Sequence, residues 1–438
     1  MWQGFYQVQM SQWGVGHGGF HSQIIAFQKL KRPNAERIGD PETFSLIYDC
    51  GSGRGRVARK SFVKAVTRML NSFPVSQSVD LLVISHFDAD HINGLSHLAA
   101  ELRSRTPVVE VKKVWAPILS KIEALYLIAQ SADTGEASAD LAAFLNDPES
   151  ALTEFFPGAE IDFIPYGSEP VPLEQMRNEE SDRDAQQTGG PTPISLVNAD
   201  DSGAVILSAD PAEGREVLWE FRPYATESAL VGANSVATAV AKLLKKPVGQ
   251  CSVSDMLNLA RDKTLLGKFH AAVRAHHSSN ATAGRKYPPT GANLSSLCVY
   301  SGPAFPYDWC AYRGGWDQID ADREAIPFAP SWLGTGDASL AKQVFVDEMA
   351  NRFTQSRLDR VGIASAPHHG SYLDSDAPLW DALPNVRMVT IEADNNVGYN
   401  GGHRHPHSQV LTELSSRGIQ IKFATQNNDF RWLDRRFR

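Results

Sequence analysis

The sequence predicts a layered α/β domain, and two observations support this prediction. Near both ends of the 438-residue chain, short apolar runs typical of buried strands alternate with segments whose apolar residues recur every three or four positions, as in amphipathic helices. Four of the apolar runs also lead into polar segments that contain Asp or His. Open α/β sheets place their functional sites at the carboxyl ends of strands, so this order is typical of a site built at one sheet edge.

The first part of the chain, to about residue 116, shows this order clearly. Its predicted strands are 5–8, 44–48 and 81–84, and its predicted helices are 62–70 and 95–102. The second strand leads into a glycine-rich turn, and the third leads into SHFDADHING at 85–94. This decapeptide therefore connects a buried strand to a helix.

The middle of the chain, from about 117 to 290, has a different pattern. Helical spacing recurs at 122–129, 137–145, 236–244 and 256–276. The segment 167–193 has almost no apolar residues and is typical of a long loop.

From about residue 291 the α/β order returns. Strands or strand ends are predicted within 295–302, 332–340, 361–372 and 386–394. The last three lead into TGDAS, APHHGS and, after a loop, GGHRHPHS.

Composition narrows the possible functions. The chain is 42% hydrophobic and 21% charged, with a net charge of −8. This charge gives no general attraction to nucleic acid or anionic membranes, although a local basic groove is compatible with it. No apolar stretch approaches the ~20 residues of a membrane span, no secretory signal is recognisable, and the four cysteines lack metal-site or disulfide spacing. We expect a cytoplasmic protein without a membrane partner.

The segment from His86 to His91 contains four metal-capable side chains in six positions. Beyond a strand end, alternate residues point the same way, so His86 and Asp88 can converge on one ion. Asp90 and His91 begin the following helix and can face a second ion. Imidazole and carboxylate groups both bind divalent metals. The alternative is a helix capped by Asp90 with exposed histidines.

Three later motifs contain further imidazole and carboxylate groups. They provide Asp337, the pair His368 and His369, and the trio His403, His405 and His407. Taken alone, APHHGS is compatible with a surface loop and GHRHPH with a fortuitous metal-binding tract. Together with the first motif, and in this order, they predict one composite ligand set.

The order H-x-D-x-D-H, N-x-x-S-[LIV], G-D-A, P-H-H-G-S and H-P-H resembles the metallo-β-lactamase-fold hydrolases. In particular it resembles the subgroup typified by the hydrolase domain of ComEC-type DNA-uptake proteins. The matching positions are 86–91, 293–297, 336–338, 367–371 and 405–407, and 14–25 with 48–52 resemble the opening strands. The resemblance implies an αββα sandwich that needs both ends of the chain. It skips about 117–290, which we therefore interpret as a mostly helical and loop insertion within one domain spanning 1–438.

The resemblance also implies a dinuclear metal centre. Its ligands would be His86, Asp88, Asp90, His91, Asp337, His368 and His405, with Asp337 bridging the ions and His369 as the alternative to His368. The broader fold has His where this chain has Asp88. The additional carboxylate makes the site harder, which favours manganese or magnesium relative to a zinc site richer in imidazole. The resemblance implies two divalent ions, zinc or manganese, with magnesium also compatible. A mid-chain ligand of the wider fold is not identifiable; His270, His276 and His277 are candidates, although helical histidines are more often structural.

The expected chemistry is hydrolysis by a metal-bound hydroxide, with two cations clamping the group under attack. Asp90, His369 and His407 are the candidates for direct catalytic roles. The leaving oxygen would be protonated by His407, or by whichever of His368 and His369 is not a ligand.

Three functions remain open. The leading hypothesis is a phosphodiesterase or nuclease acting on nucleic acid or a nucleotide. A basic run at 54–60 would then steer phosphate, although an exposed helix start with solvated charges is the more ordinary explanation of it. The second hypothesis is hydrolysis of a small ester, lactone or lactam, which the acidic net charge slightly favours. The third is an effector or sensor module whose insertion binds a protein partner.

Overall fold

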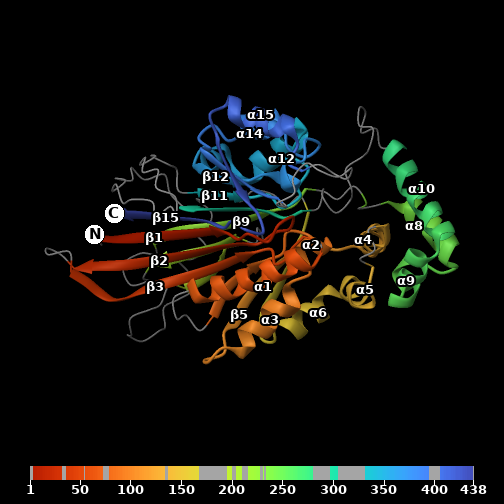
Figure 1. The fold of residues 1–438 in the computed structure, drawn as a ribbon, viewed down its shortest axis with the longest axis horizontal. Helices are drawn as coiled ribbons and strands as arrows, with labels where there is room; N and C mark the ends of the chain where they lie inside the picture. Colours follow the sequence, from red (N-terminus) through yellow and green to blue (C-terminus); the bar gives the residue numbers. More distant parts are fainter. Residues whose placement is uncertain are drawn as a thin grey trace.

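The computed structural model describes residues 3–31, 36–53, 55–72, 78–133, 137–166, 195–199, 204–209, 216–226, 230, 233–279, 296–303, 331–393 and 405–437. These residues form two mixed β-sheets with helices on their outer faces (Figure 1). The predicted α/β class is therefore confirmed.

The first sheet contains seven strands of the described chain in the order β15-β1-β2-β3-β4-β5-β6. They are β1 (Gln3–Gln12), β2 (His21–Lys31), β3 (Glu36–Tyr48), β4 (Ser78–Val83), β5 (Glu110–Pro117), β6 (Glu160–Ile164) and β15 (Phe430–Phe437). The strands from β3 to β6 are parallel, and the others pair antiparallel. Because Met10 of β1 pairs with Trp432 of β15, both ends of the chain belong to this sheet.

The second sheet contains eight strands of the described chain in the order β14-β13-β12-β11-β10-β9-β8-β7. They are β7 (Ser195–Ala199), β8 (Ala204–Ala209), β9 (Glu216–Tyr224), β10 (Cys298–Pro303), β11 (Ser331–Gly334), β12 (Val361–Ser365), β13 (Met388–Glu392) and β14 (Gln420–Ala424). The strands from β11 to β14 are parallel. The parallel halves of both sheets contain the strands that lead into the predicted site.

The sheets pack face to face, and β4 shows why its sequence is an unbroken apolar run. Leu81 and Val83 point into the core between the sheets, where they join residues such as Trp115 and Trp332. Leu82 points to the opposite face and joins the core beneath the helices. Successive strand residues face opposite sides, so a strand buried on both faces has apolar residues at every position.

Helices cover the outer face of each sheet (Figure 1). On the first sheet α1 (Gly55–Ser72) and α3 (Leu95–Ser104) bury apolar stripes that include Val66 and Leu98. On the second, α12 (Gln343–Phe353), α14 (Ala377–Asp381) and α15 (Ser408–Ser416) do the same with Met349, Trp380 and Leu414. The short elements α2 (Ala89–Ile92), α13 (Gln355–Leu358) and η4 (Pro367–Gly370) complete these parts of the chain.

The region from 117 to 290 provides both helices and strands. Its helices are α4 (Lys121–Asp133), α5 (Ala139–Asn146), α6 (Pro148–Phe155), α8 (Asn234–Leu244), η3 (Val248–Gln250), α9 (Val253–Arg261) and α10 (Lys263–Ser279). The last three α-helices lie together at one end of the molecule (Figure 1). The region also places β6 in the first sheet and β7, β8 and β9 in the second, so it is not only helix and loop. The polar segment 167–193 lies outside the described residues.

The helical pattern at 256–276 corresponds to two helices, α9 and α10, that meet at Asp262. The Asp262 carboxylate accepts hydrogen bonds from the backbone N–H groups of Thr264 and Leu265. A side chain that caps a new helix start in this way favours a break over a continuous helix. In the described ranges, none of the helices combines the length and the apolar character that crossing a bilayer requires.

Candidate metal centre

The site lies where strand ends of the two sheets meet. In the first sheet, Asp49 follows β3 and the His86–His91 segment follows β4; in the second, Asp337 follows β11 and the two histidines of η4 follow β12. Leu297 N donates to Ser85 O across the gap between the sheets. Both sheets therefore supply polar groups to one edge of the sandwich.

The first group of possible ligands consists of His86, His91 and Asp337, whose ligand atoms lie within 4.8 Å of one another. Asp337 Oδ2 is 3.5 Å from His86 Nε2, and Asp337 Oδ1 is 3.3 Å from His91 Nε2. All three side chains are buried. Residues from positions 86, 91 and 337 of the sequence thus form one compact acid–imidazole cluster.

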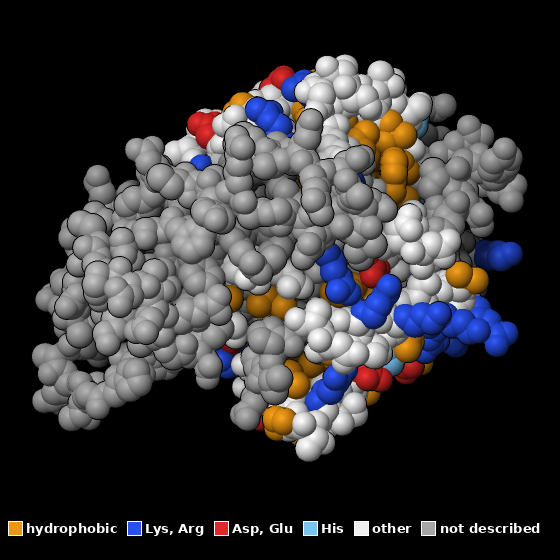
Figure 2. Space-filling view, turned by 60° about the vertical axis from the view of Figure 1, so that its left-hand side comes forward, with side chains coloured by type: hydrophobic (Ala, Val, Ile, Leu, Met, Phe, Trp, Pro, Cys, Tyr) orange, Lys and Arg blue, Asp and Glu red, His pale blue; other side chains and the backbone are white. Residues whose placement is uncertain are grey.

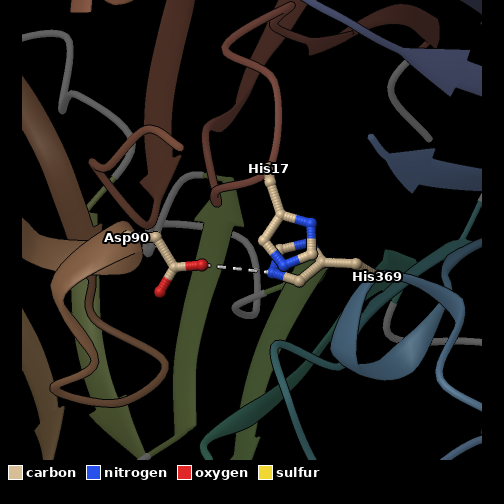
Figure 3. Close-up of side chains that lie close together, drawn as sticks. All are labelled: His17, Asp90 and His369. Carbon is tan, nitrogen blue, oxygen red and sulfur yellow. Dashed lines mark ion pairs between the residues drawn. The ribbon is translucent and has the colours of Figure 1, made fainter. Parts of the chain in front are cut away.

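The second group consists of His17, Asp90 and His369, also with ligand atoms within 4.8 Å. They come from the β1–β2 loop, from α2 and from η4, and point toward one another (Figure 3). Asp90 Oδ2 lies 3.5 Å from His369 Nε2, and the rings of His17 and His369 are 3.9 Å apart. The two groups adjoin, because His369 Nε2 is also 3.8 Å from Asp337 Oδ1.

Hydrogen bonds behind the imidazoles fix their orientation. His91 Nδ1 donates to Asp49 at 2.9 Å, and Ser85 Oγ donates to the same carboxylate at 2.7 Å. The Ser85 hydroxyl can then accept from His86 Nδ1, 2.9 Å away. Because these Nδ1 atoms hold protons, the Nε2 atoms of His86 and His91 face the site, as metal-binding histidines require.

A second carboxylate–imidazole pair lies beside the first. His368 Nδ1 donates to Asp374 at 2.8 Å, and Ser339 Oγ holds the other oxygen of this carboxylate at 2.8 Å. His368 Nε2 consequently points to Asp337, 3.6 Å from its Oδ2.

The backbone of the site adopts conformations that few residues accept. Of the five non-glycine residues with positive φ in the described chain, three are Asp49, His368 and His369. Gly51 packs against the backbone of α2, where a Cβ would lie 2.0 Å from Asp90 O. Strained and tightly approached backbone is characteristic of functional sites, where the surrounding packing holds it in place.

The side chains perturb one another's ionisation. Burial would raise the pKa of Asp337, but the imidazoles of His368, His91 and His86 hold it well below its usual range. Burial likewise opposes the charge of His91, yet Asp337 and Asp49 raise its pKa well above the usual value. Burial raises the pKa of Asp88 to about 6 despite the nearby His86. The acid–imidazole clusters therefore retain protons that a bound cation would displace.

Most of the predicted ligands come together. His86, Asp90, His91, Asp337 and His369 belong to the two groups. Asp88 Oδ2 is 3.8 Å from His86 Nε2, and the His405 ring is 4.9 Å from that of His368. The helix-cap alternative does not hold: the N-cap residue of α2 is Asp88, without a side-chain cap hydrogen bond, and Asp90 lies inside the helix.

The geometry distinguishes the two η4 histidines, which the sequence left as alternatives for one metal ligand. The first was named as the ligand with the second as its alternative, and His369 was also a candidate catalytic group. His369 is 2% exposed and belongs to the second group. The side chain of His368 is 27% exposed and belongs to neither group.

Other predicted residues lie outside the two groups, although the backbone N–H of His407 donates to Gly370 O at the end of η4. His407, a predicted proton donor, is the N-cap of α15: its Nδ1 accepts from Gln409 N, and its ring lies 4.4 Å from that of Tyr372. His276 contacts Ser235 of α8, and His270 lies beside Phe269 on α10. Neither belongs to the two groups. His403, 293–295 and the His277 side chain lie outside the described residues.

Four residues at the site were not predicted from the sequence: His17, Asp49, Asp374 and Glu392, the last of which lines a small cavity with Asp49, His91 and His369. His17 stands alone between glycines in GVGHGG, a pattern with no ligand spacing. Asp49 and Glu392 each lie at the carboxyl end of an apolar run, which was the available signal. Asp374 follows His368 by six residues, beyond any helical or strand period.

The residues fit a divalent cation. His86 Nε2, His91 Nε2, His369 Nε2 and Asp337 Oδ1 are buried polar atoms that form no hydrogen bond in the described structure. Such atoms are costly to bury unless something pairs with them, and these four converge. Imidazole nitrogens with carboxylates suit zinc, manganese and related ions.

Comparison of the sequence with models of known protein families gives no match. Comparison with curated proteins gives none either. The functional argument therefore depends on the site itself.

Proposed function

We propose that the protein is a dinuclear metal-dependent hydrolase of the metallo-β-lactamase type, acting on a phosphodiester. One observation supports this most: two adjoining groups of ligand atoms, linked through Asp337 and His369, converge at the strand ends of a helix–sheet–sheet–helix arrangement. The order of layers and the position of the motifs agree with the resemblance of the sequence to that family.

Each group of ligands would hold one ion. His86, His91 and Asp337 would bind the first, and His17, Asp90 and His369 the second. Asp88 and His405 flank these groups and would complete or border them. Bound zinc or manganese supplies a Lewis acid that polarises a phosphoryl oxygen and lowers the pKa of water.

The chain's own residues would orient the metal ligands and protonate the leaving oxygen of the substrate. Asp49 holds His91 with Nε2 toward the site, and burial excludes bulk water around that pair. His368 is the most suitable proton donor: Asp374 fixes its Nδ1, and its partly exposed ring can reach a leaving oxygen through Nε2.

A basic surface next to the site favours a phosphodiester over a neutral ester or lactam. Helix α1 has the exposed residues Arg56, Arg59, Lys60 and Lys64 and contains no Asp or Glu, while its Arg68 pairs with Asp429. It begins just after the turn in which Ser52 and Asn93 exchange two hydrogen bonds, beside α2. Figure 2 shows Lys and Arg side chains gathered in a band with few acidic ones between them. Arginine and lysine attract phosphate oxygens.

The test is hydrolysis of bis(4-nitrophenyl) phosphate, DNA, RNA and cyclic nucleotides, with a nitrophenyl ester and a lactam in parallel, in Mn²⁺, Zn²⁺ or Mg²⁺. We expect phosphodiester cleavage that is lost in the Asp90→Ala/His91→Ala variant. The matched control is Asp140→Ala/His276→Ala, which removes one Asp and one His from α5 and α10. Cleavage of only the ester or lactam would contradict the substrate class, and phosphodiester cleavage that survives the first variant would contradict the site.

A further inference from the structure

A chain of buried hydrogen bonds crosses the space between the two sheets and ends at Glu392. Its members, in order, are Trp219, Ser301, Gln23, His21, Gln12 and Glu392. All six are buried. They come from β9, β10, β2, β1 and β13, so the chain ties both sheets to the final residue of β13.

The donors of this chain point toward Glu392. The Trp219 indole can only donate, 3.0 Å to Ser301 Oγ, so the hydroxyl donates onward to Gln23 Oε1 at 2.7 Å. Gln23 Nε2 then donates to His21 Nε2 at 3.2 Å, which leaves the imidazole proton on Nδ1.

The same direction continues to the carboxylate. His21 Nδ1 donates to Gln12 Oε1 at 3.0 Å, and Gln12 Nε2 donates to Glu392 Oε1 at 2.7 Å. Gln12 Nε2 also donates to Phe20 O, so turning the amide over would lose both bonds. Glu392 is thus held in place as the terminal acceptor of an aligned series of dipoles.

Glu392 and His369 line one small cavity beside the metal centre, together with Asp49, His91 and Asp337. Asp49 already accepts from Ser85 and His91. Glu392 differs from Asp49 in its hydrogen-bond donor. It accepts from the side-chain amide of Gln12, whereas Asp49 accepts from an imidazole of the site.

His369 differs from His86, His91 and His368 in one respect. Nδ1 of His91, His368 and His86 has a partner in Asp49, Asp374 and Ser85 respectively. The Nδ1 atom of His369 is buried and has no hydrogen-bond partner in the described structure. Its ring is oriented with Nε2 toward Asp90, so the Nδ1 atom needs an acceptor on the other side.

We propose that Glu392 is the positioning residue of His369, accepting the Nδ1 proton through a water molecule bound in the cavity they share. The cavity has a volume of about 10 Å³, close to the least that one water molecule needs, and the carboxylates and imidazoles in its lining can hydrogen-bond to such a water. The bond keeps His369 Nε2 unprotonated and directed at the second metal position. This inference rests on the proposed function in one point: the proposed function makes the partner of His369 Nε2 a metal ion.

The first test is the tautomer of His369 in the metal-free protein, measured by NMR on ¹⁵N-histidine-labelled full-length chain and assigned with His369→Gln. We expect Nδ1–H in the wild type. Glu392→Met, which keeps the length but removes the acceptor, should lose this preference. Glu392→Gln, which keeps an acceptor oxygen, should retain it. An unchanged tautomer in Glu392→Met overturns the proposal.

The second test is Zn²⁺ and Mn²⁺ affinity by calorimetry. Glu392→Met should weaken binding of one ion about 10- to 100-fold, the usual effect of losing a partner behind a ligand, and Glu392→Gln should restore most of it. Ser301→Ala breaks the same buried chain far from the cavity and is the control for a merely structural effect. It should lower thermal stability without weakening the metal. Equal loss of affinity in Ser301→Ala and Glu392→Met contradicts the proposal.

The results separate this inference from the proposed function. If the wild type binds no metal, the proposed function fails, and the tautomer in the metal-free protein still decides the role of Glu392. If metal binds but no phosphodiester is cut, the affinity comparison still decides it.

Discussion

Asp337 offers one carboxylate oxygen to each of two buried imidazoles. Oδ2 is 3.5 Å from His86 Nε2, and Oδ1 is 3.3 Å from His91 Nε2. The two histidines lie on either side of the α2 start, and Asp337 comes from the opposite sheet. A cation bound here would therefore connect the two halves of the sandwich.

Asp337→Asn should remove the stabilisation contributed by one of the two ions. Zn²⁺ or Mn²⁺ at 100 times the dissociation constant of a site should raise the free energy of unfolding by about 2.7 kcal/mol for each site that it fills. The variant loses the one carboxylate of the group formed with His86 and His91, whereas the second group stays intact. Added metal should therefore stabilise the variant by about 2.7 kcal/mol less than the wild type. Urea unfolding with and without metal measures this, and Asp381→Asn, at an exposed ion pair with Arg417, is the control. Equal stabilisation of wild type and Asp337→Asn would exclude Asp337 as a ligand.

His368→Gln and His369→Gln should separate a turnover defect from a binding defect. His368 belongs to neither ligand group, so its variant should keep both ions and lose kcat. His369 belongs to the second group, so its variant should lose one ion. Metal titration followed by single-turnover kinetics distinguishes the two, and the opposite pattern would make His368 the metal ligand and His369 the group needed for turnover.

His17→Ala should reduce binding from two ions to one. It removes an imidazole from the group formed with Asp90 and His369 and leaves the group around Asp337 intact. Calorimetric stoichiometry measures the effect, with His276→Ala as the control on α10. Two ions bound with unchanged affinity would show that His17 only packs against His369.

Unfolding should become easier in mild acid because of His21. Burial lowers the pKa of this imidazole to about 3, and its ring stacks on Trp332 at 4.2 Å. The unfolded chain binds the proton below pH about 6.5, so His21 destabilises the fold progressively as pH falls, by about 2 kcal/mol at pH 5.

The difference between wild type and His21→Gln isolates this effect. Glu392 has a pKa raised to about 7 by burial and contributes with the opposite sign, but it is present in both proteins. From pH 7.5 to 5, the free energy of unfolding by urea should fall by about 2 kcal/mol more in the wild type than in the variant. Parallel curves would contradict a neutral buried His21.

The sequence allowed prediction of the elements whose pattern is local. The β4 run is apolar at every position because both of its faces are buried, and the His86–His91 motif directly follows it. The apolar spacing at 256–276 did not reveal the break between α9 and α10, because the break depends on the polar side chain of Asp262, which caps the second helix. Strands β7 to β9 were missed because the family resemblance does not extend over them.

The site was predictable where imidazoles and carboxylates cluster in the sequence. Asp49 and Asp374 contribute to the site by accepting a hydrogen bond from one imidazole each, and these pairs form only when the chain is folded. His17 reaches the centre because the β1–β2 loop folds over it, with Gly51 close to α2 beneath. His407 was assigned to catalysis from its motif, while its position before Ser408 makes it a helix cap.

The most direct test of the account is elemental analysis after saturation with Zn²⁺ or Mn²⁺ and removal of free metal. The account predicts two ions per chain in the wild type and in Asp140→Ala/His276→Ala. It predicts neither ion in Asp90→Ala/His91→Ala, which removes one ligand from each group. A wild type with less than one ion per chain, or a double variant that keeps both, would contradict the dinuclear centre.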